Sequence, residues 1–252
     1  MSDYDRNVAA RGFGAARAEA IDVGLRAYMI RVYNYMAAGV ALTGVVAWLT
    51  FNAAVVTDAA GRITGLTSFG QTIFSGPLTI VLFLGTLGLV FFLSFRINSL
   101  QPSTALMLFM LYAGLLGLML SSVFLAYTGA SITRTFFISA ASFGALSLYG
   151  YTTQRDLSPI GSFLTMGLFG LILAMLVNMF LKSSGLEFAI SVIGVLIFAG
   201  LTAYDTQRIK EMYSANDDGT IAGRKAVMGA LRLYLDFINI FLFLLRFMGD
   251  RR

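Results

Sequence analysis

The run ALRLYLDFINIFLFLLRFMG occupies Ala230–Gly249 and is the segment that most restricts what kind of protein this is. It has the length of about 20 residues that a helix needs to cross the hydrocarbon core of a bilayer. A carboxylate, Asp236, lies inside it. An aspartate at the centre of a membrane helix costs about 3 kcal/mol, so such a residue normally faces a bundle interior or a water-filled path and has a polar partner. The segment therefore predicts a membrane helix with a buried acidic group.

The whole chain has the composition of an integral membrane protein. Of its 252 residues, 58% are hydrophobic and 12% are charged, and the mean hydropathy is +0.79. Soluble domains carry about 25% charged residues. Seven apolar stretches of spanning length cover residues 28–52, 77–95, 104–127, 135–152, 159–181, 187–205 and 228–248. No strand-like alternation runs through them, so we expect an all-α membrane protein with seven transmembrane helices.

The first 27 residues are polar and have no apolar core of the secretory signal type. They contain Arg6, Arg11, Arg17 and Arg26 together with Asp3, Asp5, Glu19 and Asp22. The connections between the later stretches are short. We therefore expect a polar cytoplasmic leader over residues 1–27 and a single transmembrane domain over residues 28–252.

The distribution of Lys and Arg predicts the orientation, because cytoplasmic loops carry an excess of both. With the N-terminus inside, the inner segments hold Arg6, Arg11, Arg17, Arg26, Arg96, Arg155, Arg208, Lys210, Arg224 and Lys225, and the outer loops hold Arg62, Arg134 and Lys182. Arg251 and Arg252 then fall outside, which would suit a last segment that enters and returns. We prefer seven full crossings with the N-terminus in the cytoplasm.

Two residue types are missing, and their absence excludes several chemistries. The chain has no Cys and no His, so disulfides, thiolate zinc sites, histidine-ligated metals and imidazole bases are all excluded. No phosphate-binding loop, dinucleotide-binding turn or aromatic–basic nucleic-acid surface is present. We therefore expect no enzyme, no cofactor and no nucleic-acid partner, and attribute the net charge of +5 to membrane topology.

Three charged residues from different helices are expected at one depth. The second span runs inward and ends at Arg96 in FFLSFRINSL, and the sixth ends near Asp205 in LTAYDTQRIK. The seventh starts on the same side, which puts Asp236 roughly 10 Å inside that surface at 1.5 Å per residue. Arg96, Asp205 and Asp236 should therefore share the cytoplasmic third of the membrane.

The stretch LTAYDTQRIK, followed by LRLYLDFINIFLFLLRFMG, resembles the C-terminal signature of the transmembrane Bax-inhibitor-motif family in its bacterial branch. The resemblance implies six helices around a central C-terminal helix in a bacterial inner membrane, and a pH-sensitive passive leak of Ca²⁺. It also implies a pair of aspartates as pH sensor, here Asp205 and Asp236, and an arginine latch, here Arg96.

The physical chemistry of such a pair can be stated independently of the family. Two carboxylates within hydrogen-bond reach in a poorly solvated site do not both ionise cheaply, so the pair shares a proton and holds two helices together. Loss of that proton leaves two like charges. The helices then separate, and an oxygen-lined path opens that suits Ca²⁺ or another hard cation. Asp205 and Asp236 are thus candidate transient ligands of the passing ion.

Simpler interpretations exist for each charged residue. Asp205 can pair with Arg208 at the interface, and Asp236 can pair with Arg232, four residues earlier on the same helix face. Arg96 can extend its side chain to the interface without any further role.

Two neutral polar residues are weaker candidates. Asn239 shares a helix face with Asp236, and Tyr204 precedes Asp205 in the chain. Either can support the pair with a hydrogen bond, although packing is the plainer role for the tyrosine.

Four other functions compete with a leak. A proton-coupled transporter would use the same carboxylates, and a non-conducting regulator of a membrane protease or another membrane-protein partner would not need them. A retinal protein would need a buried lysine, but Lys182, Lys210 and Lys225 all fall in loops. An intramembrane aspartyl protease usually carries GxGD, whereas Asp205 follows Thr-Ala-Tyr.

Overall fold

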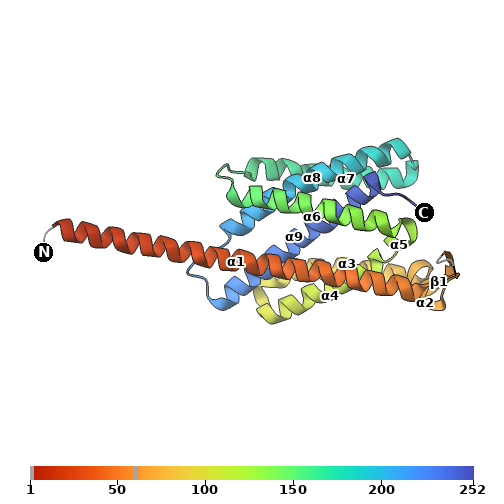
Figure 1. The fold of residues 1–252 in the computed structure, drawn as a ribbon, viewed down its shortest axis with the longest axis horizontal. Coiled ribbons are helices and arrows are strands. Elements are labelled where there is room, and N and C mark those ends of the chain that lie inside the picture. The colour runs from red at the N-terminus through yellow and green to blue at the C-terminus, as the bar shows by residue number, and fades with distance from the viewer. Residues whose placement is uncertain (1–2, 60–61) are drawn as a thin grey trace.

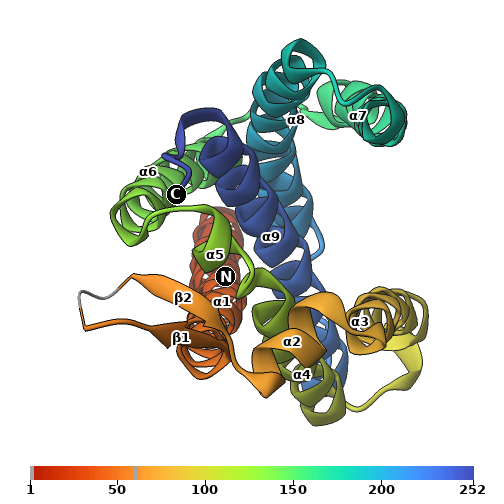
Figure 2. The same ribbon diagram turned by 90° about the vertical axis from the view of Figure 1, so that its right-hand side faces the viewer.

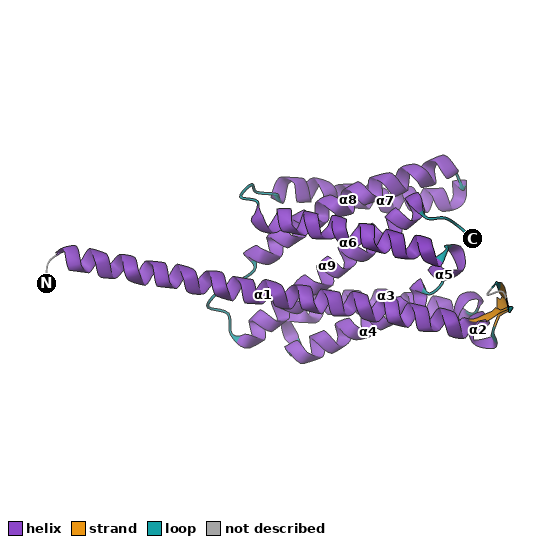
Figure 3. Ribbon diagram, viewed as in Figure 1, coloured by secondary structure: helices purple, strands orange, loops and turns teal. Residues whose placement is uncertain are grey.

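The fold is almost entirely helical, with one short hairpin (Figure 3). A computed structural model describes the backbone of residues 3–59 and 62–252 and the side chains of residues 23–59 and 62–252. Its helices are α1 (Asp3–Ala54), α2 (Ser68–Ser75), α3 (Pro77–Arg96), α4 (Pro102–Leu120), α5 (Val123–Ala126), α6 (Gly129–Thr152), α7 (Ser158–Leu181), α8 (Ser184–Glu211) and α9 (Gly219–Met248), with a 3-10 turn η1 (Ile97–Ser99). The strands β1 (Val55–Thr57) and β2 (Ile63–Leu66) pair antiparallel.

Most of the expected leader is part of the first helix. α1 begins at Asp3 and continues into the first span without a break, so leader and span are one helix that extends beyond the bundle (Figure 1). The leader arginines Arg6, Arg11 and Arg17 lie outside the residues whose side chains are described.

Within the residues that the structure describes, six helical segments are long and apolar enough to cross a membrane. They are Val23–Ala54, Pro77–Ser99, Pro102–Ala126, Ser158–Leu181, Ser184–Glu211 and Gly219–Met248. The remaining predicted span, 135–152, falls in α6, which has 24 residues but is not among the six. An all-α protein with membrane-spanning helices is confirmed, whereas the count of seven is not.

The polarity of α6 follows from its packing. Its buried face repeats a small hydroxyl residue at positions 131, 135, 139 and 147, a spacing that lets two membrane helices approach closely. Helix α8 lies so close that a Cβ atom at Gly150 would collide with the carbonyl oxygen of Ala203. Ser147 also hydrogen-bonds Thr206 of α8 at 2.9 Å. The hydroxyls that lower the hydropathy of α6 therefore face the interior.

The C-terminal helix α9 lies at the centre of the bundle (Figure 2). In its most apolar window 61% of the residues are buried, against 11% in α3 and in α7. It packs against α1, α4, α6 and α8, while α3 packs mainly on α4 and α7 on α8. Of the six helices expected around α9, four therefore contact it directly, and two, α3 and α7, lie at the periphery.

The start of α1 and the C-terminus lie at opposite ends of the bundle (Figure 1). α9 runs unbroken for 30 residues, about 45 Å at 1.5 Å per residue, and does not enter and return. The segment between α1 and α3, expected as a plain loop, instead forms the hairpin and α2. Thr67 caps α2 by accepting a hydrogen bond from the Gly70 amide at 3.1 Å.

Candidate functional site

The candidate site lies where α8 and α9 pack antiparallel. Towards the end of α8, Ile209 is packed on Gly229, where a Cβ atom would lie 3.0 Å from the isoleucine side chain. Towards the other end, the rings of Phe198 and Phe243 stack with centroids 5.8 Å apart. These two contacts set the register of the helix pair. They bring Asp205, six residues before the end of α8, level with Asp236 in the middle of α9.

The carboxyl groups of Asp205 and Asp236 lie close enough to each other to interact. Asp236 is only 4% exposed, and the Asp205 side chain is 16% exposed. Among the described residues, no N–H or hydroxyl group donates to the buried Oδ2 of Asp236. An ionised carboxylate only accepts hydrogen bonds, so a bond between two carboxyl groups needs a proton on one of them. The structure thus brings two poorly solvated carboxyl groups together.

Arg232 is the cation that acts on both carboxyl groups. Its Nη1 lies 3.6 Å from Asp205 Oδ1, so it forms an ion pair across the helix interface. The alternative pairing of Arg232 with Asp236 within α9 is replaced by this contact. The Arg232 side chain is 41% exposed, which puts the ion pair at the edge of the site.

Two other cations stay away from the pair. Arg208 forms its ion pair with Glu211 at 3.8 Å, although its charge still acts on Asp205 at longer range. Arg96 ends α3 with an exposed side chain, and α3 packs on α4. Across the part of the chain with described side chains, no ion pair of Arg96 is found. The structure does not bring the expected latch to the carboxyls.

The two neutral candidates point elsewhere. The ring of Tyr204 lies over Gly161 of α7, where a Cβ atom would lie 2.4 Å from it. The Asn239 amide donates to the Leu235 carbonyl of its own helix at 2.8 Å. Neither contact involves the aspartate pair.

The sequence of this chain also matches a known protein family. Residues 25–252 match the family model described as inhibitor of apoptosis-promoting Bax1. The chain belongs to the Bax inhibitor-1 family. Relatives include protein RP147 of Rickettsia prowazekii, 48% identical over the full length of both chains. Inner membrane protein YbhL of Escherichia coli K12 is 48% identical over 91% of this chain and 94% of its own. The resemblance noted in the sequence is thereby confirmed, and this is a Bax inhibitor-1 family membrane protein.

In this Bax inhibitor-1 family protein, a hydroxyl network beside the pair was missed in the sequence. Tyr234, two residues before Asp236, bonds Thr43 of α1 through their hydroxyls at 2.6 Å. Thr43 Oγ1 also donates toward the Ala113 carbonyl of α4 at 2.9 Å. The network ties α9 to α1 and α4 next to the carboxyl site. A lone threonine in an apolar run gave no signal of this role, because its partner lies 191 positions away.

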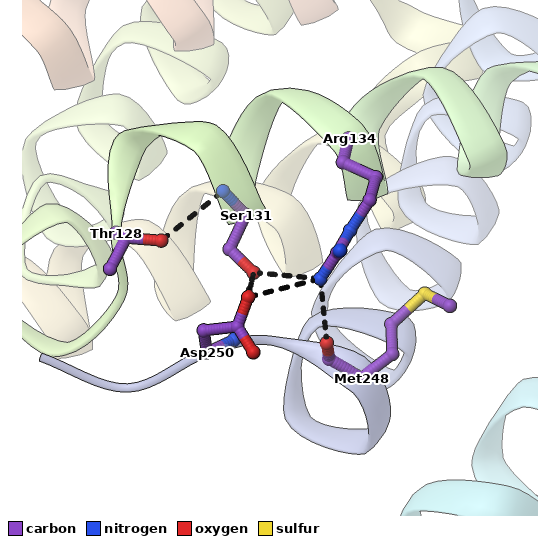
Figure 4. Close-up of polar contacts among 5 residues, drawn as sticks. All are labelled: Thr128, Ser131, Arg134, Met248 and Asp250. Carbon is purple, nitrogen blue, oxygen red and sulfur yellow. Dashed lines mark hydrogen bonds and ion pairs between the residues drawn. The ribbon is translucent and has the colours of Figure 1, made fainter.

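The C-terminal tail forms a second polar cluster at the opposite end of the bundle (Figure 4). Nη2 of Arg134 lies 3.1 Å from Asp250 Oδ2 and donates to the Met248 carbonyl at 3.3 Å. The Asp250 amide donates to Ser131 Oγ at 2.8 Å. Next to this cluster, Arg251 pairs with Glu187 at 2.7 Å, and the hydrogen bond to Glu187 raises the pKa of Arg251 above its usual value. Asp250 and Arg251 therefore fasten the tail to α6 and α8, respectively.

The site offers few ligands to a resident metal. Within the described residues, no group of three or more acidic, histidine or cysteine side chains exists. Resident Ca²⁺ sites use six to eight oxygens, whereas this site has two carboxyl groups with a guanidinium nearby. Such a set fits brief contact with a passing cation better than tight binding.

Proposed function

We propose that this Bax inhibitor-1 family protein is a passive, pH-sensitive leak for Ca²⁺ and related cations, gated by the Asp205–Asp236 pair. One observation carries the proposal: two carboxyl groups from adjacent helices lie close enough to interact, and Asp236 is buried. The protein would act as a channel-like path and not as an enzyme.

The gate works through one proton. With the proton in place, the hydrogen bond joins α8 to α9. Without it, two like charges about 4 Å apart repel by about 4 kcal/mol at an effective dielectric constant near 20. This repulsion favours separation of α8 from α9. The gate is therefore closed at low pH, where the pair is protonated, and open at high pH.

Arg232 takes the latch role in place of Arg96. Its ion pair with Asp205 stabilises that carboxylate once it is charged, and so lowers the energy of the open state. Arg232 would thereby set the pH at which the gate opens. The support for this assignment is its position next to Asp205, whereas the Arg96 side chain is exposed on a peripheral helix.

The proposed path suits a hard cation. Once the carboxylates are charged, they offer oxygen ligands at the centre of the bundle, and Ca²⁺ prefers oxygen ligands. Two carboxylates without further ligands hold the ion weakly, which passage requires. In this proposal Ca²⁺ is the conducted ion, and protonation of the pair controls its passage.

We further propose seven crossings, with α6 as the additional one and the N-terminus in the cytoplasm of a bacterial cell. The bias of Lys and Arg toward the leader side supports this orientation. The description of YbhL as an inner membrane protein supports the same membrane for this chain.

Calcium entry into liposomes that contain the purified protein and an internal calcium dye tests the proposal. We expect entry above that of empty liposomes, rising with pH, and unchanged in rate when a protonophore abolishes the proton gradient at constant pH. Calcium entry that stops when the proton gradient is abolished would indicate a proton-coupled transporter. Entry no faster than in empty liposomes at any pH would favour the non-conducting regulator.

A further inference from the structure

Two pockets lie at different heights between α1 and α6, and we treat them as the inner and outer parts of one groove. Its inner part has a volume of about 630 Å³ and is lined by residues that include Arg26, Tyr33, Gly144, Ser147 and Tyr151. Its outer part has a volume of about 420 Å³ and is lined by residues that include Gly44, Trp48, Phe137 and Phe237. We call the two parts together the α1–α6 groove.

The rims of the α1–α6 groove are exposed apolar side chains. Ile30 and Leu148 beside the inner part are 49% and 63% exposed, and Trp48 and Phe137 beside the outer part are 56% and 66% exposed. In a membrane protein such a surface faces lipid tails and not water. The groove therefore opens sideways into the bilayer.

Two cations flank its inner mouth. Arg26 lines the inner part. Lys210 donates to the carbonyl of Tyr151, another lining residue, at 2.7 Å and lies 5.5 Å from the centre of its ring. Over the residues with described side chains, neither cation forms an ion pair. The mouth thus combines positive charge with the hydroxyl of Tyr33, which bonds Ser147 at 2.6 Å.

We propose that the α1–α6 groove binds an anionic phospholipid, with an acyl chain in the groove and the phosphate group between Arg26 and Lys210. Basic pockets between membrane helices on the cytoplasmic side bind anionic headgroups in this way. Charge at one end and apolar lining elsewhere match a single amphipathic molecule. The apolar helix of a partner would leave the two cations without a counter-charge. The binding itself goes beyond the leak and does not depend on it, while assignment to the inner leaflet rests on the proposed orientation.

Glycine positions allow a matched test. A Cβ atom at Gly144, which lines the inner part, would meet nothing within 4 Å, so Gly144→Phe fills the groove without disturbing its walls. Gly88 of α3 has the same open surroundings and is not among the residues that line either part. Gly88→Phe is therefore the control.

Native mass spectrometry of the detergent-purified protein, mixed with phosphatidylglycerol or with phosphatidylcholine, measures the bound lipid. We expect one phosphatidylglycerol to be retained in preference to phosphatidylcholine, a loss of at least tenfold in Gly144→Phe, and no loss in Gly88→Phe. Replacement of a flanking cation, in Arg26→Gln or Lys210→Gln, should lower the preference for phosphatidylglycerol about fivefold for each charge.

Three results would overturn the proposal. Equal retention of both lipids would remove the anionic preference, and unchanged phosphatidylglycerol binding in Gly144→Phe would place the lipid elsewhere. A dimer that Gly144→Phe converts to monomer would assign the groove to a second copy of the chain. Arg26 is exposed, so Arg26→Gln keeps the test decisive if Gly144→Phe folds poorly.

Discussion

At the scale of single residues, the site depends on the unequal surroundings of two like groups. Asp236 is buried among apolar side chains, and Asp205 is the more exposed of the two and lies beside Arg232. A buried charge without a partner is costly, so loss of the proton is tolerated best on the carboxyl that a guanidinium faces. The pair therefore consists of a buried carboxyl, Asp236, and a carboxyl that forms an ion pair with a cation, Asp205.

The role of Arg232 can be tested by its removal. In Arg232→Gln, the midpoint of calcium flux against pH should move upward by less than about one pH unit, because a half-exposed ion pair contributes at most about 1 kcal/mol. Arg96→Gln should leave the midpoint in place. The liposome assay across pH measures both, and a shift in Arg96→Gln alone would return the latch role to Arg96.

The hydroxyl network around Tyr234 makes a second prediction. Tyr234→Phe removes the bond to Thr43 and should lower the free energy of unfolding by about 1 kcal/mol, within the range found for hydrogen bonds between membrane helices. Tyr28→Phe is the control, since the Tyr28 hydroxyl is buried and has no partner among the described residues. Denaturant titration of both variants measures the difference. Equal losses would mean that the Tyr234 bond contributes nothing specific.

The sequence identified the aspartates because an ionisable group in an apolar helix is costly wherever the helix lies. It did not identify their cation. The spacing of Arg232 and Asp236 shows that they share a face of one helix, but not which way a long side chain turns toward a neighbouring helix. That direction depends on the packing of α8 against α9, which is a tertiary contact. The same limit concealed the bond between Thr43 and Tyr234.

At the scale of elements, hydropathy predicted the existence of the long helices better than their ends. The stretch predicted at 228–248 is the apolar part of α9, which starts at Gly219 because Asp218 caps it by accepting from the Ile221 amide. The stretch at 135–152 likewise missed the start of α6, where the residues are small and polar. Strands β1 and β2 and helix α2 are too short to give a periodic signal.

The close approach of α6 to α8 predicts a strong effect at one glycine. In Gly150→Val, the new side chain would collide with the backbone at Ala203, and a collision with backbone is relieved only by separating the helices. We expect a loss of about 2 kcal/mol or more in unfolding free energy. The same change at Gly88, where the space is open, is the control, and denaturant titration compares the two. Similar small losses in both would contradict the tight α6–α8 contact.

At the scale of the whole molecule, two clusters of charged residues lie at different heights of an apolar bundle. The carboxyl site lies toward the end where α8 stops and α9 begins, and the tail cluster lies at the other. The central position of α9 connects them. Composition and hydropathy were sufficient to predict the class of the molecule, but the count of crossings depends on α6, whose polar face is hidden only after folding.

The tail cluster should hold the C-terminus without stabilising the fold. Its ion pair between Arg134 and Asp250 is largely exposed, so Arg134→Gln should change unfolding free energy by less than about 1 kcal/mol. Residues 250–252 should nevertheless become mobile, which a spin label at the C-terminus would report as faster motion. The double exchange Arg134→Asp with Asp250→Arg should restore slow motion, and its failure would show that the charges are not what fastens the tail.

The absence of cysteine makes the topology directly measurable. A single cysteine in place of Lys182, between α7 and α8, should react with a membrane-impermeant thiol reagent added outside intact cells. A cysteine in place of Asn216, between α8 and α9, should react only after the membrane is opened. The opposite pattern would reverse the proposed orientation, and access to both sites from one side would mean that α8 does not cross.

The central claim is that a proton shared by Asp205 and Asp236 controls cation passage. Asn keeps the size and a neutral hydrogen-bonding end of each side chain but cannot titrate, so the double variant Asp205→Asn with Asp236→Asn isolates the proton. The measurement is the slope of calcium flux into liposomes between about pH 5 and pH 8. We predict that the double variant loses most of the slope that the unaltered protein has. A double variant that keeps the full slope would contradict the account, because neither aspartate would then be the sensor.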